Sequence, residues 1–224
     1  VSFHFGLPPK HLLARVRRTG AKIVSSATTV EEAQWLDHAG CDAIIAQGFE
    51  AGGHRGTFLR QTVDGQVGTM ALVPQIVDAV RVPVIAAGGI GDPRGVAAAF
   101  ALGASAVQVG TAFLFCQEAN VSTLHRQAAR SAQAEQTVVT NIFTGRPARV
   151  CETRIVRELG PIAKTVPDFP LAAAPLGPLR AASEPDGSTD FMPLWCGQAA
   201  RLSPDLSAAA LTRWLSKSTG EASG

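Results

Sequence analysis

Short apolar or β-branched runs alternate with helical patterns through the first half of the chain. Five of these runs have the length and composition of strands, at 1–5, 22–26, 43–47, 82–87 and 106–109. After the first four runs, apolar residues recur every three or four positions, as they do on one face of a helix. This alternation predicts a parallel sheet with helices packed on it, joined as βα units.

Capping residues mark two of the expected helix starts. Thr29 and Glu32 have the spacing of a capping box, which predicts a helix that runs to about residue 39. Asp92 suits the N-cap and Pro93 the first turn of a helix over 95–102.

The second half of the chain loses this regular spacing. Residues 117–139 are expected to be helical, and 161–193 are rich in Pro, Ala and Gly, which suits a lid or a plain structural cap. Ser203 as N-cap and Pro204 at the first position predict a final helix that packs on the rest of the fold. Its apolar stripe consists of Leu206, Leu211, Trp214 and Leu215.

Two architectures fit the alternation of strands and helices. An open doubly wound sheet can be complete with five strands, whereas a closed (β/α)₈ barrel has eight strands in about 250 residues. The fourth and fifth strands each end in a glycine-bearing turn, which favours a site shared by the last two strands of a barrel. We therefore expect an α/β fold, a TIM (β/α)₈-type barrel that lacks its first strands, with a small, mostly helical insertion after the last strand.

The expected organisation has three parts. Residues 1–115 would supply five β/α units of the barrel, 116–190 the helical or irregular insertion, and 191–224 a C-terminal helix that packs back on the barrel. The chain has no initiator Met and begins in an expected strand, so we expect it to start inside a larger domain.

Composition narrows the class of protein. The 224 residues are 46% hydrophobic and 17% charged with a formal net charge of +2, which is typical of a globular chain with a large core. Balanced charge, the absence of Tyr and the lack of a basic block argue against nucleic acid, and no run is long enough to span a membrane. The four cysteines are spread singly, which favours buried free thiols in a cytoplasmic protein and no metal site.

The loop over 47–56, Gln-Gly-Phe-Glu-Ala-Gly-Gly-His-Arg-Gly, carries the strongest chemical signal. Glycine allows the backbone to approach a ligand closely, and imidazole is the side chain whose pKa lies nearest neutral pH. His54 is therefore the candidate acid–base residue. Gly88-Gly89 and Gly110-Thr111 could bind a phosphate through backbone N–H groups, or could simply turn a strand into a helix. No GxGxxG or Walker pattern is present.

Several motifs together resemble one enzyme family. Val-Ser-Phe-His-Phe-Gly-Leu-Pro at 1–8, the loop over 47–56, Ala-Ala-Gly-Gly-Ile-Gly-Asp at 86–92 and Thr-Gly-Arg-Pro-Ala-Arg at 144–149 occur in that order. Gly-Ala-Ser-Ala-Val-Gln-Val-Gly-Thr at 103–111 and Leu-Trp-Cys-Gly-Gln-Ala-Ala at 194–200 complete the set. The chain resembles the nitronate monooxygenase family, formerly called 2-nitropropane dioxygenases.

The resemblance implies a flavoprotein oxidoreductase, a monooxygenase that binds FMN and oxidises alkyl nitronates or nitroalkanes with O₂. It implies His54 as the catalytic base that takes the proton α to the nitro group or orients the nitronate. It also implies that Gln47 and Gly52 lie against the flavin. The residues implied to hold the phosphate end are Gly89, Gln108, Val109, Gly110 and Thr111.

The remaining charged and histidine residues have structural explanations. Glu50 and Arg55 are expected to be surface charges or to support the site from outside it. His4 could face the ligand or pack within the first strand. His11, His38 and His125 are expected on solvated helix faces.

Two other functions remain open. A flavin-dependent enoyl-acyl-carrier-protein reductase shares a similar loop and double-glycine turn, and it would consume NAD(P)H with an enoyl thioester. The missing strands also allow a non-catalytic half-barrel. The sequence leaves open the physiological substrate, the use of NAD(P)H and the oligomeric state, including a homo-oligomer.

Overall fold

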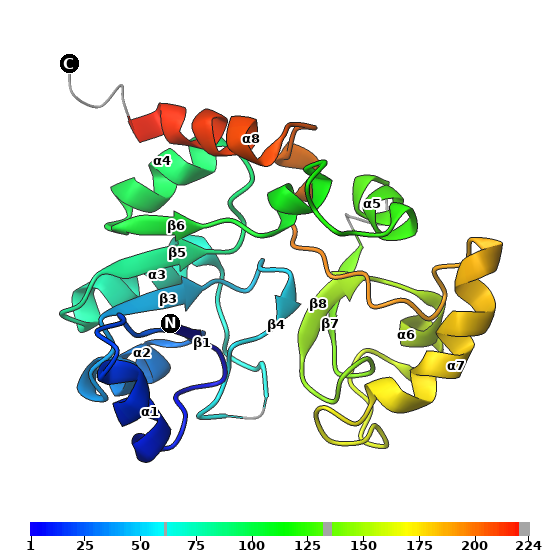
Figure 1. The fold of residues 1–224 in the computed structure, drawn as a ribbon, viewed down its shortest axis with the longest axis horizontal. Coiled ribbons are helices and arrows are strands. Elements are labelled where there is room, and N and C mark those ends of the chain that lie inside the picture. Colours follow the sequence, from blue (N-terminus) through cyan, green and yellow to red (C-terminus); the bar gives the residue numbers. More distant parts are fainter. Residues whose placement is uncertain (61, 132–135, 220–224) are drawn as a thin grey trace. The chain divides into compact units, whose positions relative to one another are not determined.

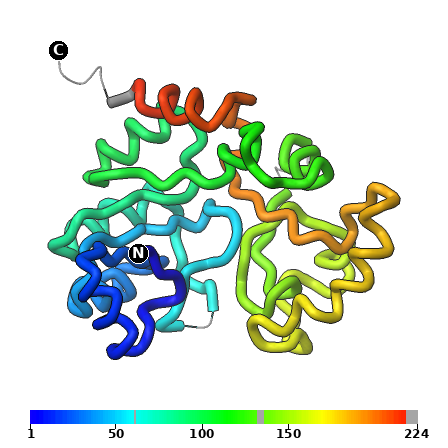
Figure 2. Tube along the Cα trace, in the orientation of Figure 1, coloured from blue at the N-terminus to red at the C-terminus, as the bar shows by residue number. Residues whose placement is uncertain are grey.

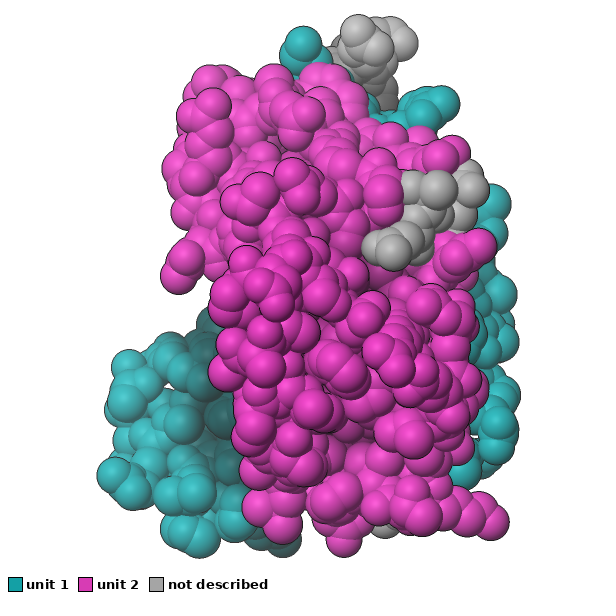
Figure 3. All heavy atoms as spheres, turned by 90° about the vertical axis from the view of Figure 1, so that its right-hand side faces the viewer, with its two compact units in different colours: residues 1–50, 56–109, 215–224 teal, residues 51–55, 110–214 magenta. Residues whose placement is uncertain are grey.

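A computed structural model describes residues 1–60, 62–131 and 136–219. The chain divides into two compact units (Figure 3). Unit 1 comprises Val1–Glu50, Gly56–Val109 and Leu215–Gly224, and unit 2 comprises Ala51–Arg55 and Gly110–Trp214. The loop over 47–56, called the glycine-histidine loop from here on, is divided between the units. Its residues 51–55 belong to unit 2, and the residues on either side of them belong to unit 1.

Unit 1 is built on a five-stranded sheet in the order β1-β2-β3-β5-β6 (Figure 1). All four neighbouring pairs are parallel. The strands are β1 (Ser2–Phe3), β2 (Val24–Ala27), β3 (Ala43–Gln47), β5 (Val84–Ala87) and β6 (Ala106–Gln108). All five strands expected from the sequence are present: β3 has the expected bounds, β2 is shifted toward the C-terminus, and β1, β5 and β6 are shorter than expected.

The helices of unit 1 follow the strands in the expected alternation. They are α1 (Lys10–Arg17), α2 (Val30–His38), α3 (Thr69–Ala79) and α4 (Pro93–Ala101), followed much later by the 3-10 helix η5 (Ser216–Thr219). Helix α2 contacts β2 and β3, α3 contacts β3 and β5, and α4 contacts β6 and η5. Apolar side chains between these helices and the sheet are fully buried, among them Ile23, Leu36, Ile44, Leu72, Val73 and Ile76.

The helix caps read from the sequence are confirmed. The Thr29 side chain accepts a hydrogen bond from Glu32 N at 3.2 Å, and Asp92 accepts one from Gly95 N at 3.1 Å. Pro93 occupies the first turn of α4. Strand β1 ends earlier than expected because Phe5 and Gly6 have φ of 66° and 83°, a left-handed conformation that ends an extended strand.

Unit 2 contains a three-stranded antiparallel sheet in the order β4-β8-β7 (Figure 1). The part of the chain that supplies β7 and β8 is the yellow-green stretch of the tube in Figure 2. Its strands are β4 (Gly53–His54), β7 (Thr137–Thr140) and β8 (Ala148–Cys151). Helices and 3-10 turns complete the unit: η1 (Thr111–Phe115), α5 (Thr123–Arg130), α6 (Arg154–Leu159), α7 (Ala173–Ser183), η3 (Glu184–Asp186), η4 (Ala200–Leu202) and α8 (Ala208–Leu215).

The expectation of helix over 117–139 was wrong at both ends, because the described helix begins at Thr123, and residues 132–135 of the span lie outside the described residues. Within that span the described helix is α5, and Thr137 to Val139 lie in β7. The β-branched run Thr-Val-Val-Thr favours a strand, and the pairing with β8 stabilises it.

The start expected for the last helix was also wrong. Helix α8 begins at Ala208, and the capping hydroxyl is that of Ser207, which accepts a hydrogen bond from Ala210 N at 3.3 Å. The carboxylate of Glu118 accepts a second hydrogen bond from Ala208 N at 3.1 Å. Two acceptors therefore serve the free N–H groups of this end, and the Ser-Pro signal at 203–204 precedes it without starting the helix.

Two apolar clusters form the core of unit 2. One contains Phe115, Ala128, Ala129, Cys151, Met192, Leu194, Cys196 and Ala200. The other contains Ile142, Phe143, Val150, Ile155, Val156 and Leu176. All four cysteines of the chain are free and buried, as the sequence predicted.

The described part of the chain has no helix that is long and apolar enough to cross a membrane. Its five parallel strands do not close into a barrel. The division at residues 115/116 and 190/191 stays a prediction.

Candidate functional site

The carboxyl ends of three strands in unit 1 form a single row. Gln47 of β3 pairs with Ala87 of β5, and Ala87 pairs with Gln108 of β6. The register therefore places the two glutamines expected at the flavin on the same edge of the sheet. Gly88 and Gly89 follow Ala87 with φ of 99° and 71°, a backbone conformation that residues other than glycine rarely adopt.

Gln47 closes the loop that begins after it. Its Oε1 accepts a hydrogen bond from Gly56 N at 2.7 Å, which joins the two ends of the loop within unit 1. Gly56 is required there because a Cβ would lie 2.9 Å from the ring of His4 and from Ser26 Cβ. The ring of His4 is exposed and its Nδ1 lies 3.1 Å from Ser26 Oγ, so His4 helps to pack this end of the loop.

Glu50 links the loop to the start of α3 by hydrogen bonds. Its carboxylate accepts hydrogen bonds from Thr69 N at 2.8 Å and Thr69 Oγ1 at 3.0 Å, at the start of α3. A Cβ at Gly89 would lie 3.6 Å from the Glu50 side chain. Glu50 is thus half-buried and fixes α3, the loop and the β5 turn together.

Glu32 holds the chain that leaves the loop. Its carboxylate is 1% exposed and accepts hydrogen bonds from Thr28 N at 2.7 Å, Thr28 Oγ1 at 2.7 Å and Phe58 N at 2.6 Å. Thr57 Oγ1, at 3.1 Å, is a further donor. Glu32 therefore does not complete a capping box, and it ties α2 to the segment after Gly56.

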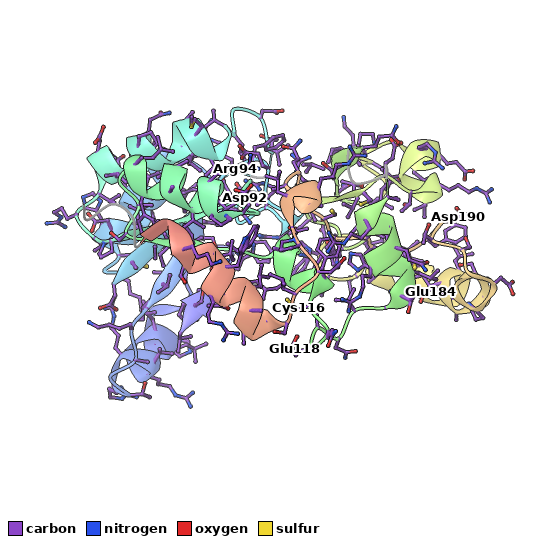
Figure 4. The ribbon with its side chains drawn as sticks, turned by 90° about the horizontal axis from the view of Figure 1, so that it is seen from above. Asp92, Arg94, Cys116, Glu118, Glu184 and Asp190 are labelled. Atoms are coloured by element: carbon purple, nitrogen blue, oxygen red, sulfur yellow. The ribbon has the colours of Figure 1, made fainter. Side chains whose placement is uncertain are left out.

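Asp92 and Arg94 form an ion pair where α4 begins (Figure 4). Burial of Asp92 opposes its ionisation, but hydrogen bonds from Arg94 and from Gly95 N outweigh that effect and hold the pKa of Asp92 below its usual value. The Asp92 carboxylate therefore serves the N-terminal end of α4 by accepting a hydrogen bond from Gly95 N.

His54 lies on β4 in unit 2. Strand β4 pairs with β8, so that Gly53 is opposite Arg149 and His54 opposite Ala148. The Nε2 atom of His54 lies 2.8 Å from Thr144 Oγ1, in the loop between β7 and β8. A long-range pairing thus presents the loop imidazole to a hydroxyl group.

Aromatic rings pack on the imidazole of His54. The ring centroid of Phe169 lies 5.8 Å away in an edge-on arrangement, and that of Trp195 lies 5.3 Å away. Phe169 is 42% exposed, and its ring also lies 5.7 Å from the guanidinium of Arg146. The imidazole is therefore flanked by two large apolar rings.

His125 is not on a solvated helix face, contrary to the expectation. It is half-buried, and its Nε2 donates a hydrogen bond to the carbonyl of Trp195 at 2.9 Å. The donor role follows because a carbonyl oxygen can only accept. His125 thus anchors the backbone of a residue that contacts His54. His11 and His38 are exposed, as expected.

Gly52 allows two chain segments to touch. A Cβ at this position would overlap Gly197 N and would lie 2.6 Å from the carbonyl carbon of Cys196. Gly197 N donates in turn to Thr111 Oγ1 at 3.0 Å. Within unit 2, Gly52 and Thr111 therefore meet at the backbone of residues 196–197, and the side chain of Thr111 is used structurally.

Arg55 is fully buried, which excludes the surface position and leaves the other expected role, a charge that supports the site from outside it. The pairing with β8 continues past β4, because Arg55 N donates a hydrogen bond to Pro147 O at 2.9 Å. Gly110 is the N-cap residue just before η1, and no heavy atom lies within 4 Å of the place its Cβ would occupy.

Two buried thiols lie in the apolar core of unit 2. Cys151 and Cys196 share one apolar cluster and flank the bridge between Val150 and Trp195. A hydrogen bond between the thiols, with Arg149 nearby, lowers the pKa of Cys196, and the same hydrogen bond together with burial raises the pKa of Cys151.

The structure groups the expected site residues by unit. Gln47, Gly89 and Gln108 share the sheet edge of unit 1, where Val109 is the last residue before the boundary. Gly52, His54, Gly110 and Thr111 belong to unit 2.

Three neighbours of His54 had no expected role: Thr144, Phe169 and Trp195. Thr144 and Trp195 stand in motifs that carried the family resemblance, and those motifs were the available signal. Phe169 stands in the Pro-rich stretch and had no such signal.

Known proteins resemble this chain over nearly all of its length. The family model described as nitronate monooxygenase matches residues 1–217. A probable nitronate monooxygenase of Staphylococcus saprophyticus is 41% identical over 223 residues, which cover 99% of this chain and 63% of that protein. A probable nitronate monooxygenase of Staphylococcus aureus strain Newman is 44% identical over 201 residues, which cover 89% of this chain and 57% of that protein. The chain thus spans less than two thirds of the length of these relatives.

Solved structures give the same result. The nitroalkane oxidase from Streptomyces ansochromogenes matches with a TM-score of 0.87 and 41% identity, over 96% of this chain and 62% of that one. FabK from Thermotoga maritima matches with a TM-score of 0.75 and 32% identity, over 97% of this chain and 67% of that one. These likenesses confirm the α/β, barrel-type fold and the family resemblance read from the motifs. The chain belongs to the nitronate monooxygenase family.

Proposed function

We propose that this chain is part of an FMN-dependent oxidoreductase that oxidises alkyl nitronates, or the nitroalkanes from which they form, with O₂. His54 is its catalytic base. The observation that carries this proposal is the setting of His54: a histidine in a glycine-rich loop, hydrogen-bonded to Thr144 and flanked by Phe169 and Trp195. Family membership supports the reaction class.

The residues assigned to FMN suit a ligand that is bound mainly through the backbone. Gly88 and Gly89 have positive φ, and Gly110 has open space where a Cβ would lie. Backbone N–H groups at such turns bind phosphate without Lys or Arg. Gln47 and Gly52 would lie against the flavin ring. The phosphate end would be held by Gly89, Gln108, Val109, Gly110 and Thr111.

The bound FMN would accept the electrons and react with O₂. His54 would take the proton from the carbon that bears the nitro group, and the electron pair of that C–H bond would form the C=N bond of the nitronate. When the substrate is already a nitronate, His54 would orient it. The rings of Phe169 and Trp195 give the imidazole apolar walls on two sides.

An absorbance titration with FMN tests the cofactor assignment. We expect saturable band shifts for the wild-type protein and weaker binding for Gly110→Ala, because the added methyl group would occupy the space proposed for the ligand. Gly177→Ala is the matched control, since its Cβ also meets no atom within 4 Å and it lies in α7, away from the proposed residues. Equal FMN affinity of both variants would remove Gly110 from the site.

Comparison of two substrates tests the role of His54. His54→Ala should lower turnover of a neutral nitroalkane by about 10²–10⁴-fold, the usual contribution of a general base. Turnover of the preformed nitronate should fall much less, because that substrate has already lost its proton. An equal loss on both substrates would refute proton abstraction by His54.

The same preparations distinguish the other functions. Consumption of NAD(P)H with an enoyl thioester, without O₂ uptake on a nitronate, would favour the flavin reductase. A folded protein that binds FMN but turns over neither substrate would favour a non-catalytic role.

A further inference from the structure

Thr144 makes a close polar contact with the imidazole of His54. Its Oγ1 lies 2.8 Å from Nε2, although the two residues are 90 positions apart in the chain. Thr144 is half-buried, and its hydroxyl also faces the backbone of Arg146. The hydroxyl is therefore a fixed feature of the histidine's surroundings.

The loop around Thr144 is held by close packing. Gly145 has φ of 89°, and a Cβ there would lie 2.5 Å from Phe169 N and 2.8 Å from the carbonyl carbon of Asp168. Gly145 N also donates a hydrogen bond to Asn141 O at 2.8 Å. These contacts leave the Thr144 side chain little room to move away from His54.

The hydrogen-bond partners of Thr144 limit how it can serve the imidazole. Arg146 N donates to Thr144 Oγ1 at 3.4 Å, and Thr144 Oγ1 can donate its single proton to Arg146 O at 3.4 Å. An imidazolium carries N–H on both nitrogens, so Thr144 Oγ1 must then accept from Nε2–H and direct its own proton to Arg146 O. Hydrogen bonds from a charged donor are about twice as strong as neutral ones, so this arrangement stabilises the protonated base.

We propose that Thr144 is a positioning residue for the base: it accepts a hydrogen bond from Nε2–H of neutral His54 and so makes Nδ1 the basic nitrogen. This inference rests on the proposed function of His54. The substrate proton is transferred to Nδ1, and the electron pair of the C–H bond stays with the substrate as the nitronate. No rotation of the Thr144 hydroxyl is then needed as the imidazole becomes charged.

The ¹⁵N chemical shifts of the His54 ring test the tautomer without turnover. In wild-type protein labelled with ¹⁵N-histidine, with His54 assigned from the loss of its signals in His54→Gln, we expect the proton on Nε2. In Thr144→Val we expect a mixture of tautomers, and Thr144→Ser should restore the wild-type pattern. A proton on Nδ1 in the wild-type spectrum overturns the proposal even if neither Thr144 variant folds.

Kinetics supply the second readout. Thr144→Val should lower nitroalkane turnover about 10-fold or more, the effect of losing one hydrogen bond to a charged group, while turnover of the preformed nitronate stays close to that of the wild type. Thr140→Val is the matched control, because Thr140 Oγ1 accepts a backbone hydrogen bond from Ile142 N in the same hairpin. Equal losses in Thr140→Val and Thr144→Val would show a structural role and overturn the proposal.

The two proposals fail in different ways. If His54→Ala keeps full nitroalkane turnover, the proposed function fails, whatever the tautomer. If His54→Ala loses that turnover but Thr144→Val keeps both the turnover and the tautomer of the wild type, the inference about Thr144 fails alone.

Discussion

Replacement of Glu32 should strongly destabilise the protein. Its carboxylate is 1% exposed and serves donors from two separate segments, around Thr28 and around Phe58. In Glu32→Ala the backbone amides of Thr28 and Phe58 lose an acceptor in a buried place. Such amides cannot turn toward another partner, because the chain fixes their direction.

The magnitude follows from these two amides. A buried hydrogen bond to a charged group contributes about 1.5–3 kcal/mol, so the loss of two predicts a fall of about 3–6 kcal/mol in the free energy of unfolding. The hydroxyl of Thr57 adds little, because it also faces Arg60 O at 3.0 Å and keeps that partner. Domains have total stabilities of about 5–15 kcal/mol, so this change removes a large share.

Urea unfolding at neutral pH, followed by tryptophan fluorescence, measures the effect. Glu32→Gln should lose about half as much as Glu32→Ala, because the amide oxygen can still accept from one of the two backbone amides. Glu31→Ala is the matched control: Glu31 lies on the same helix and forms an exposed ion pair with Arg60, which contributes about 0–1 kcal/mol. Equal losses in Glu31→Ala and Glu32→Ala would refute the reasoning, because exposed and buried carboxylates would then be equivalent.

Three further outcomes are expected. Asp92→Ala should lower the free energy of unfolding by about 1 kcal/mol at pH 7 through loss of the α4 cap. Because the pKa of Asp92 is lowered in the folded state, its stabilisation is complete above the unfolded pKa of about 3.9 and is lost as the pH falls below that value. If urea unfolding at pH 3 gives the same free-energy difference between variant and wild type as at pH 7, the direction of the pKa shift is contradicted. Gly52→Ala should lower the free energy of unfolding by about 1–3 kcal/mol through overpacking and weaken FMN binding, since its Cβ would overlap the backbone of Cys196 and Gly197; an unfolding free energy in urea equal to that of the wild type would show that this contact can relax. Burial raises the pKa of Cys41 to about 11, so its thiol should stay unreactive toward a disulfide reagent at pH 8 until urea unfolds the chain, and labelling of folded protein at Cys41 would count against that burial.

Local patterns in the sequence were enough for unit 1. The strand at 43–47 was placed with its exact bounds, and Thr29 and Asp92 cap their helices as expected. These features depend on neighbouring residues and on periodicity, which the sequence shows directly. The glycine-histidine loop and the family were recognisable for the same reason, since their motifs are contiguous.

Where local rules failed, contacts between distant residues decided the outcome. Ser203 carries a valid capping signal, yet α8 begins after Ser207, where Glu118 supplies a second acceptor from far along the chain. For Arg55 the sequence left open a surface position or a supporting one, and the structure buries it where its backbone pairs with Pro147 next to β8. His125 was expected in solvent and instead holds the carbonyl of Trp195.

The sequence by itself determined the alternation of strands and helices, the capped helix starts, the glycine turns and His54 as the candidate base. Only the tertiary structure showed that Glu32 links α2 to the loop segment and that His54 meets Thr144, Phe169 and Trp195. The physical reason is range: helix caps and periodicity act within a few residues, whereas the surroundings of an imidazole depend on which distant strands pair and which side chains that pairing brings together.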